Sequence, residues 1–226
     1  MTSLHSRSPA LPTELPDTSN PILYSFRRCP YAMRARLAVA SAGLQVDLRE
    51  VVLRDKPAAF LAASPSATVP CLVTTDSVID ESLDVMIWAL KQNDPEGWLN
   101  MPDVGFDWIA RADGPFKQAL DRTKYAQRYP ELDPVEERGK AAAFLSELDG
   151  LIDQWMFGHP TLADFAILPF VRQFAFIDKD WFDAQPWPEL QRWLEAFLAS
   201  ERFERIMEKY PQWGEGDAPV RFPQER

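Results

Sequence analysis

The chain has 226 residues, of which 46% are hydrophobic and 26% are charged, so it can form one large domain or two modest ones with a packed core. Its formal net charge of -10 argues against general nucleic-acid binding and against docking on an anionic membrane surface. Two cysteines and two histidines without a clustered pattern predict neither a disulfide framework nor a metal site. This cysteine usage favours a reducing, cytoplasmic location.

The N-terminal part predicts a mixed sheet covered by helices. Residues 1–20 are rich in Ser, Thr and Pro and have no apolar run, so we interpret them as an extension rather than a signal peptide. From residue 21 the order β-α-β-α-β-β-α fits within 21–92 and indicates four strands in one sheet. The expected strands are 22–26, 46–53, 68–73 and 77–79, and the expected helices are 32–42, 57–63 and 82–92.

The C-terminal part predicts an all-helical domain. Residues 93–103 contain Pro95, Gly97 and Pro102 and are expected to form a linker. The helical domain is expected over 104–212, followed by a tail at 213–226 in which we predict no strand. The helices expected from their apolar spacing are 106–128, interrupted near Gly114-Pro115, and 134–157, 161–176, 187–198 and 201–210.

Cys29 is the first candidate for chemistry, because it lies between a predicted strand and a predicted helix. Pro30 suits the first helical position, so the sulfur would face unpaired N–H groups and the positive end of the helix dipole. Arg27 and Arg28 add positive charge nearby, and we expect these features to favour the thiolate at neutral pH. The alternative is that Cys29, like most lone cysteines, is a small buried apolar residue.

Three further positions complete a possible ligand site. If the Val69-Pro70 peptide is cis, Val69 could offer a free backbone edge to an extended peptide, although most such bonds are trans. Ser82 starts a helix and could bind a carboxylate while Glu81 accepts an amine; the alternative is that Ser82 only caps the helix. Lys56 could reach a second carboxylate. Residues 21–56 hold seven basic and three acidic side chains, which agrees with a small anionic ligand.

Together these positions describe a ligand with a central thiol, a carboxylate at each end and one amine, which is the chemistry of glutathione. Residues 21–92 resemble the N-terminal, thioredoxin-like domain of the glutathione S-transferase superfamily. The stretch RRCPYAMRARL at 27–37 is similar to the cysteine-type classes, most of all the omega class. Residues 53–57, 69–70 and 81–82 match that class in order and spacing.

The resemblance implies a role for each matching residue. Cys29 would be the catalytic thiol that forms a mixed disulfide with glutathione. The residues that would bind glutathione are Leu53, Lys56, Val69, Pro70, Glu81 and Ser82. The resemblance also implies that glutathione is a co-substrate and that the protein forms a homodimer. No metal is expected.

The C-terminal half also resembles the family, more weakly. Thr161-Leu162-Ala163-Asp164 is similar to its helix-capping motif, and we expect Thr161 and Asp164 to stabilise rather than catalyse. Ala32 occupies the place where dithiol glutaredoxins carry a second cysteine, which excludes a two-cysteine mechanism through that position. Cys71 is expected to be buried in the core; the alternative is a resolving or regulatory thiol.

The activity implied is thiol–disulfide exchange through a mixed disulfide between Cys29 and glutathione, with a small thiol, disulfide or electrophile as second substrate. One alternative is a non-catalytic binding protein with the same fold. Another is a conventional conjugating transferase that uses the hydroxyl of Tyr24 or Ser25. Candidate walls for the second substrate are Phe26, Tyr31, Phe116, Tyr125 and Trp155, but we interpret each of them first as a core residue and assign none to the site.

Overall fold

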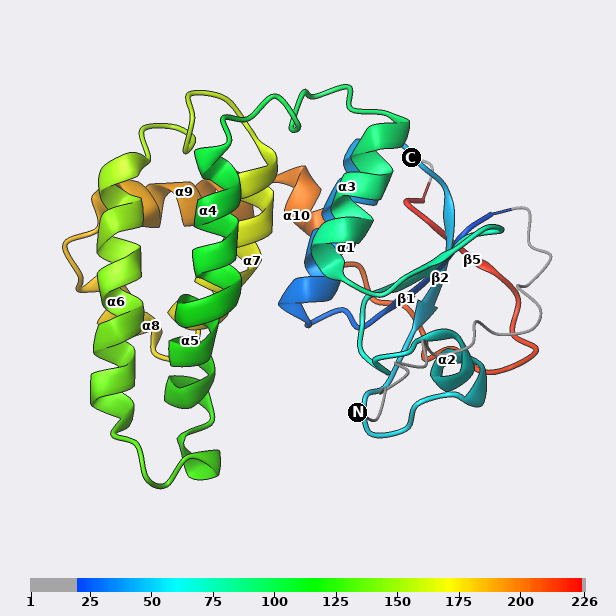
Figure 1. The fold of residues 1–226 in the computed structure, drawn as a ribbon, viewed down its shortest axis with the longest axis horizontal. Coiled ribbons are helices and arrows are strands. Elements are labelled where there is room, and N and C mark those ends of the chain that lie inside the picture. The colour runs from blue at the N-terminus through cyan, green and yellow to red at the C-terminus, as the bar shows by residue number, and fades with distance from the viewer. Residues whose placement is uncertain (1–19, 225–226) are drawn as a thin grey trace, which may run out of the picture.

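The computed structural model describes residues 20–224, so nearly all of the predicted extension at 1–20 lies outside the described residues. The chain forms a sheet-containing domain and a helical domain side by side, joined by the segment after residue 92 (Figure 1). This arrangement confirms the predicted fold class. No helix in the described part of the chain is long and apolar enough to cross a membrane.

The first domain follows the predicted order of elements. Its strands are β1 (Ile22–Ser25), β2 (Val46–Glu50), β3 (Cys71–Val73) and β4 (Val78–Ile79), and its helices are α1 (Pro30–Ser41), α2 (Ala58–Ala63) and α3 (Ser82–Gln92). Strand β1 pairs in parallel with β2 and antiparallel with β3, and β3 pairs antiparallel with β4. The sheet is therefore mixed. Strand β1 is central and fully buried, and the chain runs from its carboxyl end to Cys29 at the start of α1. The buried strand therefore fixes where Cys29 lies.

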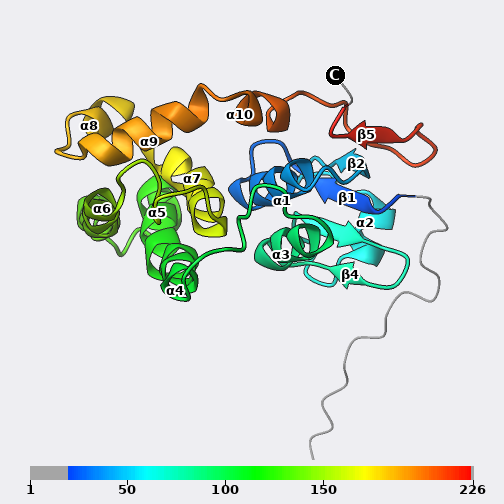
Figure 2. The same ribbon diagram turned by 90° about the horizontal axis from the view of Figure 1, so that it is seen from above.

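The sheet has a fifth strand that the sequence analysis missed. Strand β5 (Val220–Phe222) pairs antiparallel with β2, giving the order β4-β3-β1-β2-β5. The tail leaves the helical domain and returns along the sheet domain to reach this edge (Figure 2). The prediction of four strands and a strandless tail was wrong, because β2 has an open edge that a short extended segment can pair with.

The helical domain begins with a long helix that is interrupted at its middle. Helices α4 (Val104–Arg111) and α5 (Lys117–Lys124) are joined by a π-helical turn, η1 (Ala112–Phe116), that contains Pro115. A proline inside a helix lacks an N–H and displaces the carbonyl four residues earlier, which explains the wider turn. A short 3-10 turn, η2 (Ala126–Arg128), follows α5.

The remaining helices are α6 (Pro134–Leu151), α7 (Leu162–Ala175), α8 (Lys179–Asp183), α9 (Pro188–Leu198) and α10 (Glu201–Ile206). Helix α6 ends six residues before the predicted 157, and α8 was not predicted. The backbone N–H of Met156 donates instead to the Asp164 carboxylate, 3.0 Å away, so the chain after α6 is held by a tertiary contact.

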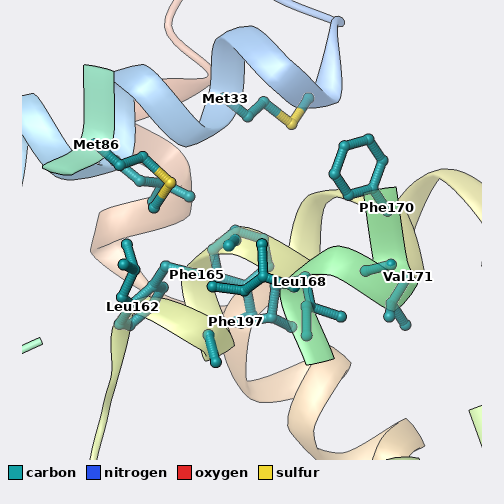
Figure 3. Close-up of a cluster of buried hydrophobic side chains, with 14 of the residues drawn as sticks. Met33, Met86, Leu162, Phe165, Leu168, Phe170, Val171 and Phe197 are labelled. Atoms are coloured by element: carbon teal, nitrogen blue, oxygen red, sulfur yellow. The ribbon is translucent and has the colours of Figure 1, made fainter. Parts of the chain in front are cut away.

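Helix α7 is the centre of the core that both domains share. Twelve of its fourteen residues are buried. It lies between α1 and α3 on one side and α9 on the other, with Met33, Met86 and Phe197 packed around it (Figure 3). The predicted capping box is present: the N–H and hydroxyl of Thr161 donate to the Asp164 carboxylate at 2.9 and 2.7 Å. Both residues are fully buried, far from solvent, which fits the structural role expected of them.

Candidate functional site

Cys29 is the residue that precedes the first turn of α1, and the strand-to-helix junction fixes its position. Its backbone N–H donates to the carbonyl of Phe26 at 3.0 Å, and its own carbonyl accepts from the N–H of Met33 at 2.9 Å. Pro30 occupies the first helical position, as expected. The side chain is half-buried rather than sealed in the core, and it forms no disulfide. A thiol in this place can meet a ligand.

The protonation state of Cys29 differs from the expectation. Burial raises the pKa of its thiol, and this outweighs the lowering by the N–H groups of Ala32 and Tyr31 and by the charges of Arg36 and Lys117. The N–H groups at the helix start lower the pKa of Cys29 as expected, but burial raises this pKa by more. The cations that act on the sulfur are also not the predicted pair, Arg27 and Arg28.

A hollow of about 380 Å³ opens beside Cys29 and gathers every residue that the sequence analysis assigned to the site. It is lined by Cys29, Leu53, Lys56, Val69, Pro70, Glu81 and Ser82, together with Tyr31, Ala67, Thr68 and Asp80. We call it the first hollow. Its walls belong to the sheet domain alone, and they come from four separate stretches of chain. Tyr31 was predicted only as a candidate wall for the second substrate. Ala67, Thr68 and Asp80 were not predicted, although Thr68 and Asp80 are direct neighbours of predicted positions.

Val69 presents its backbone to the first hollow. The Val69-Pro70 peptide is cis, the condition on which the sequence prediction depended. Val69 takes part in no backbone–backbone hydrogen bond among residues 20–224. Its carbonyl instead accepts the thiol of Cys29, with the sulfur 3.7 Å away. The thiol is the donor in this contact, and the N–H of Val69 is left available.

Ser82 has a partner that the sequence did not reveal. It is the first residue of α3, with Glu81 before it, and it does not cap the helix by a side-chain hydrogen bond. Its hydroxyl accepts from Arg34 at 3.3 Å. Arg34 is fully buried, donates to the carbonyl of Ala166 at 2.7 Å and forms a salt bridge of 2.6 Å with Asp113. The start of α3 is therefore tied to the helical domain through one guanidinium group.

Lys56 and Leu53 border the first hollow from the loop after β2. The ammonium group of Lys56 donates to the carbonyl of Ala67 at 2.9 Å, and both residues line the first hollow. This hydrogen bond holds the lysine where it would meet a ligand carboxylate. Leu53 is 44% exposed and faces the second hollow as well as the first. A leucine with this exposure offers an apolar surface at the point where the hollows join.

A second hollow of about 500 Å³ meets the first at Cys29, Tyr31 and Leu53. Phe26, Arg28 and Pro30 complete its wall on the sheet domain, and Lys117, Asp121, Lys124, Tyr125 and Gln173 form its wall on the helical domain. Three of the five aromatic candidates, Phe26, Tyr31 and Tyr125, lie here. The other two do not line it: Phe116 stacks on Phe144 in the core, and Trp155 packs against Phe165.

Tyr24 and Ser25 line neither hollow. The Tyr24 hydroxyl accepts from Arg49 at 2.6 Å, and its ring packs on Phe60 and Trp213. The hydroxyl of Ser25 is hydrogen-bonded to Arg36, and both residues are buried. Neither hydroxyl is placed to activate the thiol of a ligand in the first hollow.

Cys71 is fully buried in β3, as expected. Burial, with the neighbouring Asp80, raises the pKa of its thiol to about 12. At neutral pH it is a structural thiol, which leaves Cys29 as the candidate nucleophile. Among the residues described, no three His, Cys, Asp or Glu side chains gather as metal ligands would.

Family models match both halves of the chain. The model described as "Glutathione S-transferase, N-terminal domain" matches residues 23–97, and the one described as "Glutathione S-transferase, C-terminal domain" matches residues 106–196. A "Probable glutathione transferase" of Aplysia californica is 42% identical over 57 residues, which are 25% of this chain and 62% of that protein. "Protein IN2-1 homolog B" of Oryza sativa subsp. indica is 27% identical over 185 residues, 76% of this chain and 74% of its own.

Solved structures share the fold. A glutathione transferase family member from Pseudomonas fluorescens, solved with two glutathione molecules bound, has a TM-score of 0.71 and 21% identity over 84% of this chain and 92% of its own. Glutathione transferase Omega 3C from Trametes versicolor has a TM-score of 0.69 and 17% identity over 86% of this chain and 92% of its own.

Proposed function

Because the chain belongs to the glutathione S-transferase superfamily, we propose that it is a glutathione-dependent thiol transferase in which Cys29 carries the glutathionyl group. The observation that carries the proposal is the first hollow. It collects the seven residues chosen from the sequence and ends at a half-buried cysteine. The glutathione-bound relative from Pseudomonas fluorescens supports glutathione as the co-substrate.

Glutathione would lie along the first hollow with its sulfur toward Cys29. Val69 would pair with the backbone of the cysteinyl residue as an added strand does, using its free N–H and its carbonyl. Ser82 with the N–H groups at the start of α3 would bind the carboxylate of the γ-glutamyl end, and Glu81 would accept its amine. Lys56 would bind the glycine carboxylate. Leu53 and Pro70 would form apolar walls.

This binding mode also bears on the state of the thiol. The peptide N–H of glutathione would compete with the Cys29 thiol for the carbonyl of Val69. Binding of glutathione would therefore weaken the hydrogen bond that the thiol donates to that carbonyl. The thiolate would then keep the N–H groups of Tyr31 and Ala32 and the charges of Arg36 and Lys117, all of which favour it.

The reaction has two exchange steps. In the first, the Cys29 thiolate attacks the glutathione sulfur of a mixed disulfide; the old S–S bond breaks, the new bond joins Cys29 to glutathione, and the substrate thiolate leaves and takes up a proton from water. In the second, the thiolate of another glutathione attacks this mixed disulfide, which releases oxidised glutathione and restores the Cys29 thiolate. No cysteine besides Cys29 is needed. This agrees with the presence of Ala32, and not a second cysteine, three residues after Cys29, and with the burial of Cys71.

The hydroxyethyl-disulfide assay tests the proposal. We expect the Cys29→Ala variant to fall to the uncatalysed rate, a loss of about a thousandfold or more, because the nucleophile is gone. The matched control is Cys71→Ala, which should keep the activity of the wild type. Equal activity of wild type and Cys29→Ala would overturn the proposal.

Two alternatives give different results. A non-catalytic binding protein would be retained on glutathione resin but show no disulfide exchange in either form. A conjugating transferase would act on chloro-dinitrobenzene after Cys29→Ala and lose that activity in Tyr24→Phe. The second result is not expected, because the Tyr24 hydroxyl is turned to Arg49, outside both hollows. We also propose that the protein is located in the cytoplasm and forms a homodimer.

A further inference from the structure

The second hollow has its own chemistry, separate from that of the first. Its wall on the helical domain comes from α5, from the residue after it and from α7. Because it meets the first hollow at Cys29, a group seated in it would lie next to the sulfur that accepts the glutathionyl group. The substrate partner of a mixed disulfide would occupy this space.

Each aromatic ring of this hollow has a cation of the same hollow near it. Arg28 lies over Phe26, Lys117 over Tyr31 and Lys124 over Tyr125, with cation-to-centroid distances of 5.5, 5.6 and 5.2 Å. Such contacts hold a long basic side chain against an apolar wall, and the charges of Arg28 and Lys124, which are exposed, still face the open space. The hollow is thus apolar on its walls and positive at its rim.

The positive charge is only partly neutralised. Asp121 is the one acidic residue that lines the second hollow among the described residues, and it forms a salt bridge with Lys117. Arg28 and Lys124 are exposed and have no acidic partner within residues 20–224. This excess occurs in a chain whose net charge is -10, so the general surface charge does not account for it.

We propose that the second hollow selects a substrate whose leaving thiol carries a carboxylate on a flat apolar body. Arg28 and Lys124 bind the carboxylate, and the rings of Phe26, Tyr31 and Tyr125 pack against the body. Arg28 and Lys124 are thus specificity-determining residues for the transfer of the glutathionyl group. Neither residue lines the first hollow, where glutathione would bind. The inference rests on the proposed function, since it assigns the substrate class of the same Cys29.

Two glutathione mixed disulfides that differ by one charge test the inference. One carries para-mercaptophenylacetic acid and the other carries the neutral amide of that acid. We measure kcat/KM for transfer of the glutathionyl group, each corrected for the uncatalysed exchange. The acid is expected to react about five- to tenfold better with the wild type, and this preference should shrink as salt is added. In the double variant Arg28→Gln, Lys124→Gln the preference should fall close to one, because the rate for the acid falls.

A control variant separates this effect from net charge. Lys91 is exposed on α3 and lines neither hollow, so Lys91→Gln should keep the preference of the wild type. Equal rates for acid and amide in the wild type, or a preference that survives the double variant, would overturn the inference while leaving the proposed function intact.

A binding measurement shows whether the selectivity holds even if the proposed transferase function fails. The thioether para-(methylthio)phenylacetate cannot exchange, and its binding is followed by calorimetry with the wild type and the double variant. If it binds more tightly than its amide in a way that needs Arg28 and Lys124, but neither disulfide is turned over, the selectivity stands and the proposed function fails. If it binds no better than its amide and the disulfides react equally, the selectivity fails.

Discussion

The two hollows that meet at Cys29 are built in different ways. The first is lined by short, successive stretches of the sheet domain, and much of what it offers is backbone: the N–H and carbonyl of Val69 and the N–H groups at the start of α3. The second is lined by long side chains from both domains, with Arg28 on one side and Lys117 and Lys124 on the other.

The difference separates what is general in this site from what is particular. Backbone groups recognise a peptide without regard to side-chain identity, so a hollow built from them tolerates sequence change. A rim of basic side chains can be altered by single substitutions of exposed residues such as Arg28 and Lys124. We infer that the first hollow supplies the common co-substrate site, whereas the second decides which partner thiol is accepted. Experiments that act on one hollow should leave the other unaffected.

Among the experiments that compare the two hollows, the largest expected effect concerns the sulfur that they share. Burial raises the pKa of Cys29 in the ligand-free protein, so only a small fraction is thiolate at neutral pH. The thiolate is the reactive form, and alkylation by iodoacetamide should therefore rise about tenfold for each pH unit from about pH 7 to about pH 9, close to a hundredfold in all. Intact mass of the Cys71→Ala variant would follow the modification. A rate that levels off below about pH 7 would contradict the raised pKa.

A substitution in the first hollow should affect glutathione alone. Ser82→Ala removes a hydroxyl that faces the proposed carboxylate, and a lost hydrogen bond to a charged group should raise the KM for glutathione about tenfold. The preference for the acidic over the amide disulfide should not change. Ser41→Ala is the control, because Ser41 bonds to Glu96 outside both hollows. A changed preference in Ser82→Ala would mean that the two hollows are not independent.

A substitution in the second hollow should do the reverse with a smaller effect. Asp121→Asn releases Lys117 from its salt bridge and adds positive charge to the rim. The preference for the acidic disulfide should increase about two- to threefold, as expected for one partly exposed ion pair, with an unchanged KM for glutathione. The control is Asp153→Asn, an exposed acid outside both hollows. A weaker preference in Asp121→Asn would show that the rim does not act through charge.

The first hollow could be read from the sequence because its residues sit at element boundaries. Cys29 lies at a strand-to-helix junction, Pro70 lies directly before a strand, and Ser82 starts a helix; each boundary has a local signal. The fold of the sheet domain followed from the same signals. What the sequence could not give was the partner of Ser82, because Arg34 reaches it from another helix and is held in place by Asp113 of the other domain.

The second hollow could not be derived in the same way. Lys117 and Lys124 become neighbours of Cys29 only when the domains pack together, and no local pattern encodes that packing. The excess of basic residues in 21–56 pointed to an anionic ligand, yet two of them, Arg34 and Arg36, are buried and hold the fold together.

The same limit explains two errors of the sequence analysis. The thiolate was expected from the helix start, but the cost of burying a charge depends on what packs around Cys29. Strand β5 has only three residues, and it forms because the edge of β2 is open to it.

The central claim is that one sulfur, at the junction of the two hollows, receives the glutathionyl group. Intact-mass measurement after incubation with oxidised glutathione tests it most directly, using wild type, Cys29→Ser and Cys71→Ser. The account predicts one added glutathionyl group on the wild type and on Cys71→Ser, none on Cys29→Ser, and complete loss of the group after reduced glutathione is added. A glutathionyl group on Cys29→Ser, or none on the wild type, would contradict it.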